Sequence, residues 1–224
     1  MLIWLYLAHV HAATRAVSCD LSTEDADRLA KMISPRRREQ FIAGRRLAHY
    51  AIEQSTGIPV AEQRFATAAN GKPYCIGGPS ISLSHSEDWI ACGVACDAEI
   101  GLDLQFPVAR ADVDGIASRY FGDSERAWIA AGGRERFFML WALKEAHLKV
   151  SGMGLGGGMD SVVCQITPPR IEASFATGIA SYLSLYAFGS AFLAVAATSP
   201  PMREARIGVL DSTRHPELSF IAAT

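Results

Sequence analysis

The chain has 224 residues, of which 50% are apolar and 20% are charged. This length and composition suit one large globular domain or two small ones with their own cores. The formal net charge of −2 excludes a broad electrostatic attraction to nucleic acid or to an anionic membrane, so we expect neither as a partner. The five cysteines are odd in number and widely scattered, which disfavours a disulfide framework and indicates a reducing, cytoplasmic setting.

The chain begins with an apolar segment that ends in Val10-His11-Ala12, a sequence that resembles a signal-peptide cleavage site. The segment lacks the basic start of a secretion signal, and it is too short to span a bilayer. Trp4 and Tyr6 lie among aliphatic residues, which favours a first β-strand instead.

Helix signals dominate the next part of the chain. Ser22, followed by acidic residues, predicts the N-cap of one helix. Pro35 ends that segment and can begin a second helix, which we expect to run to Ser55 and to end at Gly57. Asn70-Gly71-Lys72-Pro73 is a turn signal. Three strand-like runs follow, which are Ser80–Ser84, Trp89–Ala95 and Glu99–Leu104.

The second half begins with helices and continues with strands. The predicted helices are Val113–Phe121, Ser124–Ala131 and Arg134–Val150. The predicted strands are Ser161–Ile166, Arg170–Phe175, Ser181–Phe188 and Ala191–Ala197. Because each half combines helices with several strands, we expect an α+β fold of two similar lobes, residues 1–98 and 99–224. Residues 200–224 form a tail without predicted elements, which can be loosely ordered.

Two short segments place carboxylates among apolar residues, where an unpaired charge would be costly. Asp103 follows the apolar residues of a predicted strand, and Glu145 lies midway along a predicted helix with Lys149 one turn later. Two carboxylates brought together can hold a hard cation such as Mg²⁺, and a nearby ammonium group suits a phosphate ester. The combination indicates phosphoryl chemistry. The alternative is a pair of ordinary surface charges, with Glu145 and Lys149 as a standard helix ion pair.

Two further polar regions can bind an anion. The hydroxyl groups and imidazole of Ser82–Ser86 stand at the end of a predicted strand and can donate hydrogen bonds to a phosphate, although an ordinary polar turn has the same composition. The basic run Arg36-Arg37-Arg38 and the pair Arg45-Arg46 fit either an anion site or a solvated helix face.

Two common catalytic patterns do not fit. Gly152-x-Gly154-x-x-Gly157 matches the dinucleotide fingerprint, but it follows a helix and precedes a strand, which reverses the order that the fingerprint needs. These glycines instead predict the end of the helix that contains Glu145 and a loop beside it. A Ser/His/Asp hydrolase is disfavoured because no Gly-x-Ser-x-Gly elbow occurs.

A series of short segments occurs in a specific order between residues 35 and 165. They are Phe41-Ile42-Ala43-Gly44-Arg45, Gly71-Lys72-Pro73, Leu83-Ser84-His85-Ser86, Ile100-Gly101-Leu102-Asp103-Leu104, Arg119-Tyr120-Phe121-x-x-x-Glu125, Trp141-x-x-Lys144-Glu145-Ala146-x-x-Lys149 and Gly152-x-Gly154-Leu155. Each segment alone is a weak signal, but the series at this spacing is specific. It resembles the 4′-phosphopantetheinyl transferases, in particular the larger, monomeric, Sfp-like type.

The resemblance implies an enzyme that transfers the 4′-phosphopantetheine group of coenzyme A to a serine hydroxyl of an acyl or peptidyl carrier protein. The reaction would release adenosine 3′,5′-bisphosphate and depend on Mg²⁺. The resemblance also implies a monomer of two similar α+β lobes, related by a pseudo-two-fold axis, with the active site in the cleft between them. Carriers of fatty acid, polyketide or nonribosomal peptide synthesis are all compatible with it.

The same resemblance assigns roles to individual residues. Three of them, Asp103, Glu145 and Lys149, match the catalytic positions; the two acids would also bind the metal, and Lys149 the pyrophosphate of coenzyme A. Asp103 also counts among the positions that bind coenzyme A, and Glu145 can accept the proton of the serine. The remaining positions expected to contact coenzyme A are Arg45, Lys72, Pro73, Ser84 and His85.

Gln105 departs from the pattern, because many relatives carry Glu at this position. An amide is a poorer Mg²⁺ ligand than a carboxylate, so we expect Gln105 to be a weak third ligand, or a water to replace it, with Mn²⁺ as a possible substitute metal. Two other functions stay open. One is a degenerate module that binds a carrier protein or coenzyme A without transfer, and the other is a metal-dependent nucleotide phosphohydrolase.

Overall fold

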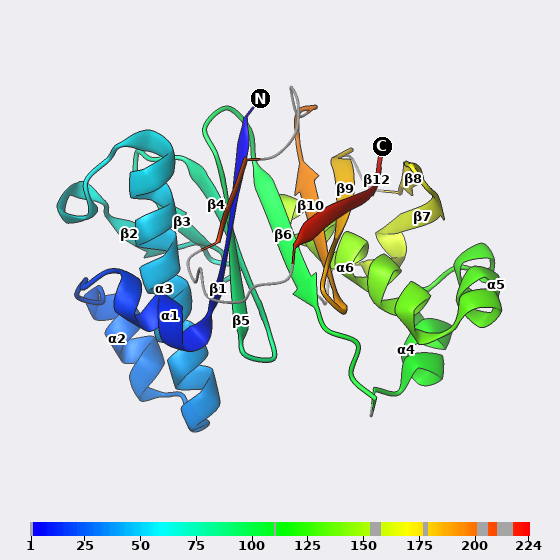
Figure 1. Ribbon diagram of the computed structural model, residues 1–224, viewed down its shortest axis with the longest axis horizontal. Helices are drawn as coiled ribbons and strands as arrows, with labels where there is room; N and C mark the ends of the chain where they lie inside the picture. Colours follow the sequence, from blue (N-terminus) through cyan, green and yellow to red (C-terminus); the bar gives the residue numbers. More distant parts are fainter. Residues whose placement is uncertain (1, 110, 153–157, 177–178, 201–205, 210–216) are drawn as a thin grey trace. The chain divides into compact units, whose positions relative to one another are not determined.

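A computed structural model describes residues 2–109, 111–152, 158–176, 179–200, 206–209 and 217–224 (Figure 1). The chain divides into two compact units. Unit 1 contains Met1–Ile100 and Pro201–His215, and unit 2 contains Gly101–Pro200 and Pro216–Thr224. Both units combine helices with sheets, which confirms the α+β class expected from the sequence, while the pseudo-two-fold relation of two lobes stays a prediction. No described helix has both the length and the apolar composition needed to cross a membrane.

Unit 1 is built on a four-stranded sheet with the order β11-β1-β5-β4. Its strands are β1 (Ile3–His9), β4 (Ser80–Ser86), β5 (Trp89–Ala95) and β11 (Arg206–Val209). The pairs β1–β5 and β4–β5 are antiparallel, and β1–β11 is parallel. The first strand thus lies where Trp4 and Tyr6 predict it. The remaining elements of this unit are α1 (Val10–Ala16), α2 (Thr23–Ala30), α3 (Pro35–Thr56), the 3₁₀ turn Val60–Glu62, β2 (Phe65–Thr67) and β3 (Pro73–Cys75).

Helices α2 and α3 begin and end where local sequence signals place them. The Ser22 hydroxyl accepts a hydrogen bond from the Asp25 backbone N–H and caps α2. Pro35 is the first residue of α3, and Gly57 ends that helix with a positive φ of 77°, a conformation that glycine adopts without strain. Small and aliphatic side chains of α3 pack on the sheet. The buried ones that form this core with β4 and β5 are Ala43, Leu47, Ala48, Ala51, Ile52, Ile81, Ile90, Cys92 and Val94.

Unit 2 is built on a six-stranded sheet with the order β6-β10-β9-β12-β8-β7. Its strands are β6 (Ile100–Gln105), β7 (Val162–Thr167), β8 (Arg170–Phe175), β9 (Tyr182–Phe188), β10 (Ala191–Ala197) and β12 (Leu218–Ala223). Helix α6 (Arg134–Ser151) packs on this sheet (Figure 1), and α4 (Val113–Tyr120), α5 (Asp123–Gly132) and the 3₁₀ turn Met159–Ser161 complete the unit. The fully buried side chains of α6 include Leu140, Ala142, Leu143 and Ala146.

The segment after Pro200 contributes more structure than the sequence predicts. It supplies β11 to the sheet of unit 1 and β12 to the sheet of unit 2. Strand β12 lies between β9 and β8, so the last strand of the chain is an interior strand of its sheet. The sequence also gave no sign of α1, β2 and β3, which are only three to seven residues long.

Candidate active site

The Asp103 carboxylate is the centre of a polar cluster in unit 2. Asp103 lies on β6 and is only 3% exposed. Its Oδ1 accepts a hydrogen bond from Lys149 Nζ at 2.6 Å, and its Oδ2 accepts one from Gln105 Nε2 at 2.6 Å. Lys149 Nζ also donates to the Leu102 carbonyl oxygen at 2.8 Å. A strand residue is thereby joined to the last turn of α6.

Glu145, one helical turn before Lys149, adds a second acid to this cluster. Its side chain is half-buried on α6. Burial and the negative charge of Asp103 raise the pKa of the Glu145 carboxyl group to about 7, although the Lys149 ammonium acts in the opposite direction. The two acids are therefore close enough to interact, and one lysine neutralises only part of their joint charge.

A glycine lets β6 approach α6 closely enough to form this cluster. A Cβ atom on Gly101 would clash with the Ala146 carbonyl oxygen and would lie 2.8 Å from the Val150 backbone nitrogen. Because both are backbone atoms of α6, they could move only with the helix. Gly101 therefore permits a strand-to-helix distance that any larger residue would increase.

The donor atoms of this cluster suit a hard divalent cation. Asp103 and Glu145 offer carboxylate oxygens, and Gln105 offers an amide oxygen, because its amide nitrogen is the atom that contacts Asp103. Among the described residues, no group of three or more His, Cys, Asp and Glu side chains is placed to hold a metal. Asp103 and Glu145 could supply two carboxylates to a bound Mg²⁺, with the amide, water or substrate oxygens as further ligands. Burial first, and then the charge of Asp103, raise the pKa of Glu145, and a bound cation would act against both causes.

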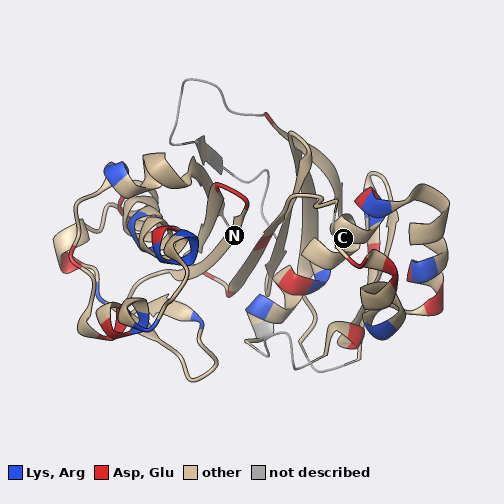
Figure 2. Cartoon of the chain, turned by 90° about the horizontal axis from the view of Figure 1, so that it is seen from below, with Lys and Arg blue, Asp and Glu red and all other residues tan. Residues whose placement is uncertain are grey.

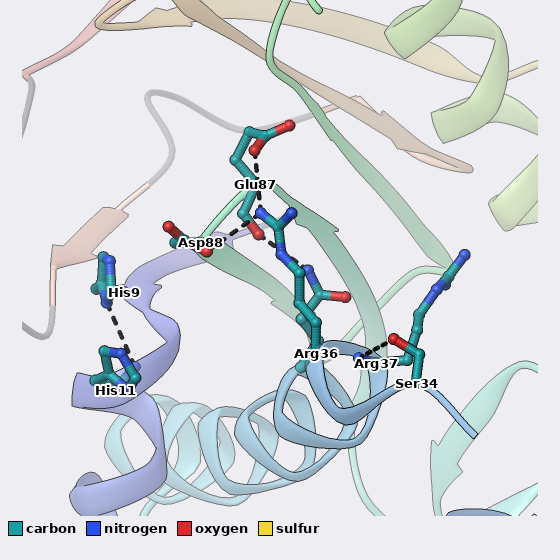
Figure 3. A network of polar contacts seen from close by, with 8 residues as sticks. His9, His11, Ser34, Arg36, Arg37, Glu87 and Asp88 are labelled. Carbon is teal, nitrogen blue, oxygen red and sulfur yellow. Dashed lines mark hydrogen bonds and ion pairs between the residues drawn. The ribbon is translucent and has the colours of Figure 1, made fainter. Parts of the chain in front are cut away.

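In unit 1, the N-terminal turns of α3 hold the hairpin that carries Ser84 and His85. Arg36 Nη2 contacts Glu87 Oε2 at 3.0 Å and Asp88 Oδ1 at 3.2 Å, at the turn between β4 and β5 (Figure 3). Gln40 Nε2 donates to the Glu87 carbonyl oxygen at 2.9 Å. These contacts fix the end of β4 beside the basic turn of α3. The exposed ring of His85 consequently lies next to a cation, since Arg37 Nη1 is 3.4 Å from His85 Nε2.

Two pockets of unit 1 meet at His85. They share Arg28, Phe41 and His85 in their walls, and their volumes are about 550 Å³ and about 270 Å³. The larger pocket is strongly cationic, because Lys31 and Arg37 line it as well. The smaller one is lined by several of the predicted positions, namely Arg45, Pro73, Ser84 and His85. Three positively charged side chains around one cavity suit a ligand with several phosphate groups.

Two predicted phosphate-binding cations have partners within unit 1. Arg45 is buried, and its Nε and Nη2 atoms donate to both carboxylate oxygens of Asp25 at 2.7 and 2.8 Å. Lys72 Nζ contacts Glu99 Oε2 at 3.0 Å and the Ile100 carbonyl oxygen at 3.2 Å. Arg45 therefore supports the wall of the smaller pocket through α2, and Lys72 lies beside the first residue of β6.

The structure adds charged residues that sequence patterns did not single out. Arg28 and Lys31 line the cationic pocket, yet they lie on and just after α2, where a charged residue has no distinguishing sequence signal. Basic and acidic residues are interspersed along the helices of each unit (Figure 2), so charge alone does not mark the pocket. The predicted glycine segment Gly154-Leu155 lies outside the described residues.

Comparison with known proteins gives a consistent result. Residues 99–195 match the family model of the 4′-phosphopantetheinyl transferase superfamily. The chain is 32% identical over 148 residues to the 4′-phosphopantetheinyl transferase psf-1 of Bacillus pumilus, covering 63% of this chain and 61% of that protein. It is 27% identical over 161 residues to HetI of Nostoc, covering 68% of each. It is 29% identical over 162 residues to Sfp of Bacillus subtilis, covering 63% of this chain and 70% of Sfp.

These matches give the class of proteins that the chain resembles. Residues 99–195 are similar to the 4′-phosphopantetheinyl transferase superfamily, and 63–68% of the chain is similar to three proteins that are named as such transferases, psf-1, HetI and Sfp. The similarity to Sfp and psf-1 agrees with the Sfp-like type expected from the sequence. The chain covers 61% of the length of psf-1, which is less than two thirds of that relative.

Proposed function

We propose that this protein transfers the 4′-phosphopantetheine group from coenzyme A to a serine hydroxyl of an acyl or peptidyl carrier protein. The observation that carries the proposal is the cluster of Asp103, Glu145 and Lys149 in unit 2, within the residues that match the family model. Relatives named as 4′-phosphopantetheinyl transferases support the same reaction.

The reaction needs positioning and charge compensation rather than a covalent enzyme intermediate. A bond forms between the serine oxygen and the phosphorus that carries the pantetheine arm. The bond from that phosphorus to the bridging oxygen breaks, and adenosine 3′,5′-bisphosphate leaves with the electron pair. Glu145 would take the serine proton, either directly or through a water. Lys149 is placed to stabilise charge on the pyrophosphate.

Asp103 and Glu145 are the residues that would hold a divalent metal, with Gln105 or a water beside them. When bound, Mg²⁺ would neutralise charge on the pyrophosphate oxygens. Lys149 now donates to Asp103, so its ammonium group would exchange this contact for a phosphate oxygen as the substrate enters. In unit 1, the cationic pocket with Arg28, Lys31 and Arg37 in its wall would by itself suit the phosphate groups of a nucleotide.

We also propose a state for this protein in the cell. The five cysteines form no disulfide, which is consistent with a reducing cytoplasm, where we expect the enzyme to act as a monomer.

The direct test is the mass of purified carrier proteins after incubation with this protein, coenzyme A and Mg²⁺ or Mn²⁺. We expect a gain equal to one phosphopantetheine group on at least one carrier, and no gain on a carrier whose acceptor serine is replaced by alanine. Binding of coenzyme A without any gain would instead favour a degenerate binding module. Release of phosphopantetheine without a carrier would favour a nucleotide phosphohydrolase.

A further inference from the structure

A second charged cluster lies in the interior of unit 2, outside the groups assigned to the reaction. Lys144 is 0% exposed and Glu125 is 1% exposed, and Lys144 Nζ lies 2.9 Å from Glu125 Oε2. Charged side chains are almost never fully buried unless they are paired. Both residues belong to segments that carry the family resemblance, yet neither contacts Asp103 or Glu145 through a hydrogen bond among the described residues.

Every polar atom of this pair has a partner. Lys144 Nζ also donates to the carbonyl oxygens of Met159 at 3.0 Å and Val162 at 2.5 Å. The carboxylate of Glu125 accepts hydrogen bonds from two backbone N–H groups, those of Gly122 at 2.9 Å and Cys164 at 3.0 Å.

The Phe121 ring, 4.8 Å from Lys144 Nζ, covers the ammonium group. The cluster therefore joins the start of α5, the middle of α6 and the start of β7.

The location of the cluster links it to the proposed active site. Lys144 precedes Glu145 on α6, and consecutive side chains of a helix point about 100° apart. A helix held on one side by Lys144 therefore has a defined rotation, which sets the direction of Glu145 and, one turn later, of Lys149. On the side toward β6, Gly101 brings the strand against the same helix.

We propose that Glu125 and Lys144 are positioning residues for the transfer reaction, which fix the rotation of α6 and so hold Glu145 and Lys149 beside Asp103. This inference rests on the proposed function. A buried ion pair is weak evidence for a gain in stability, because its desolvation can cost as much as the attraction returns. A role in orientation needs only that the fully paired cluster holds α6 in one position.

The test uses a double variant, Glu125→Gln with Lys144→Met, in the full-length protein. The double variant removes both charges together, so no unpaired buried charge remains, and we expect it to unfold cooperatively near the wild-type temperature. Its metal-free crystal structure should show the 2.6 Å contact between Lys149 and Asp103 lengthened or lost. Calorimetry with Mg²⁺ alone should show an affinity at least ~10-fold lower, and kcat should fall by a similar factor with KM for coenzyme A nearly unchanged.

The matched control removes an exposed ion pair of α5, the helix that carries Glu125, through Asp123→Asn with Arg126→Met, and should leave all these quantities unchanged. A folded double variant with the wild-type Lys149–Asp103 contact, Mg²⁺ affinity and kcat would overturn the proposal. If the double variant does not fold, Glu125→Asp serves in its place, since it keeps the charge but shortens the side chain; a wild-type contact and kcat in that variant would also overturn it. Failure of the wild-type protein to modify any carrier would count against the proposed function alone, because the crystallographic contact does not depend on activity.

Discussion

The carboxyl group of Glu145 is the residue-level feature from which a pH dependence follows. Burial and the charge of Asp103 raise its pKa from 4.5 to about 7. The folded protein therefore keeps a proton at this site that the unfolded chain releases once the pH exceeds 4.5. The favourable contribution to folding is complete below that value and is lost as the pH rises to about 7.

We expect Glu145→Gln to remove this loss of folding stability with rising pH. Without metal, the free energy of unfolding of the variant should change less between pH 5 and pH 8 than that of the wild type, as measured by urea unfolding in the presence of a chelator. The same substitution should lower kcat by at least ~10²-fold, because a general base contributes roughly 10²–10⁴-fold. Equal pH dependence in the two proteins would contradict the assigned pKa, and normal transfer rates would contradict the role as a base.

Gln105 offers a second test at the residue scale. Gln105→Glu places a third carboxylate beside Asp103 and Glu145, so we expect Mg²⁺ to bind about 10-fold more tightly. The metal-free variant should be less stable than the wild type because of like-charge repulsion. Calorimetry with Mg²⁺ and thermal unfolding with and without a chelator measure both effects. Gln165→Glu, at an exposed position of β7, adds the same charge elsewhere and should leave the Mg²⁺ affinity unchanged.

At the scale of elements, the contact between β6 and α6 decides whether the acid cluster forms. We expect Gly101→Ala to force the strand away from Ala146 and Val150, at a cost of about 1–3 kcal/mol or more in the free energy of unfolding. Transfer activity should fall further than stability alone explains, because Asp103 moves with β6.

Gly44→Ala is the matched control. Its added methyl group would lie 3.7 Å from Leu83 Cδ1, which is an ordinary contact, and it replaces glycine inside a helix. We expect this variant to be as stable as the wild type or up to about 1 kcal/mol more stable. Urea unfolding of both variants gives the comparison, and equal stabilities would show that β6 and α6 do not need the close approach.

At the scale of the whole molecule, the short strand β12 is important for the stability of the unit 2 sheet. Strand β12 separates β9 from β8, so its loss would leave a gap in the middle of the unit 2 sheet. We expect Ala222→Asp, which buries a charge at a position of 0% exposure, to lower the melting temperature markedly. Ser219→Ala, on an exposed position of the same strand, should leave it unchanged. A mild effect of Ala222→Asp on thermal unfolding would mean that β12 contributes little to the sheet.

Local signals predicted the elements well because they act within a few residues. Ser22, Pro35 and Gly57 determine where α2 and α3 begin and end through their own backbone and the adjacent N–H groups. The ordered segments around Asp103, Glu145 and Lys149 likewise sufficed to indicate phosphoryl chemistry and the family.

Only the tertiary structure decided which partners the charged residues have. Arg45 pairs with Asp25 and Lys144 with Glu125, and both pairings join residues from different helices, so no local pattern contains them. The placement of β12 inside its sheet follows from long-range strand pairing, which depends on the whole buried surface and not on the short segment itself. The sequence by itself thus determined most helices, most strands and the residue types of the site, whereas packing determined what surrounds each charge.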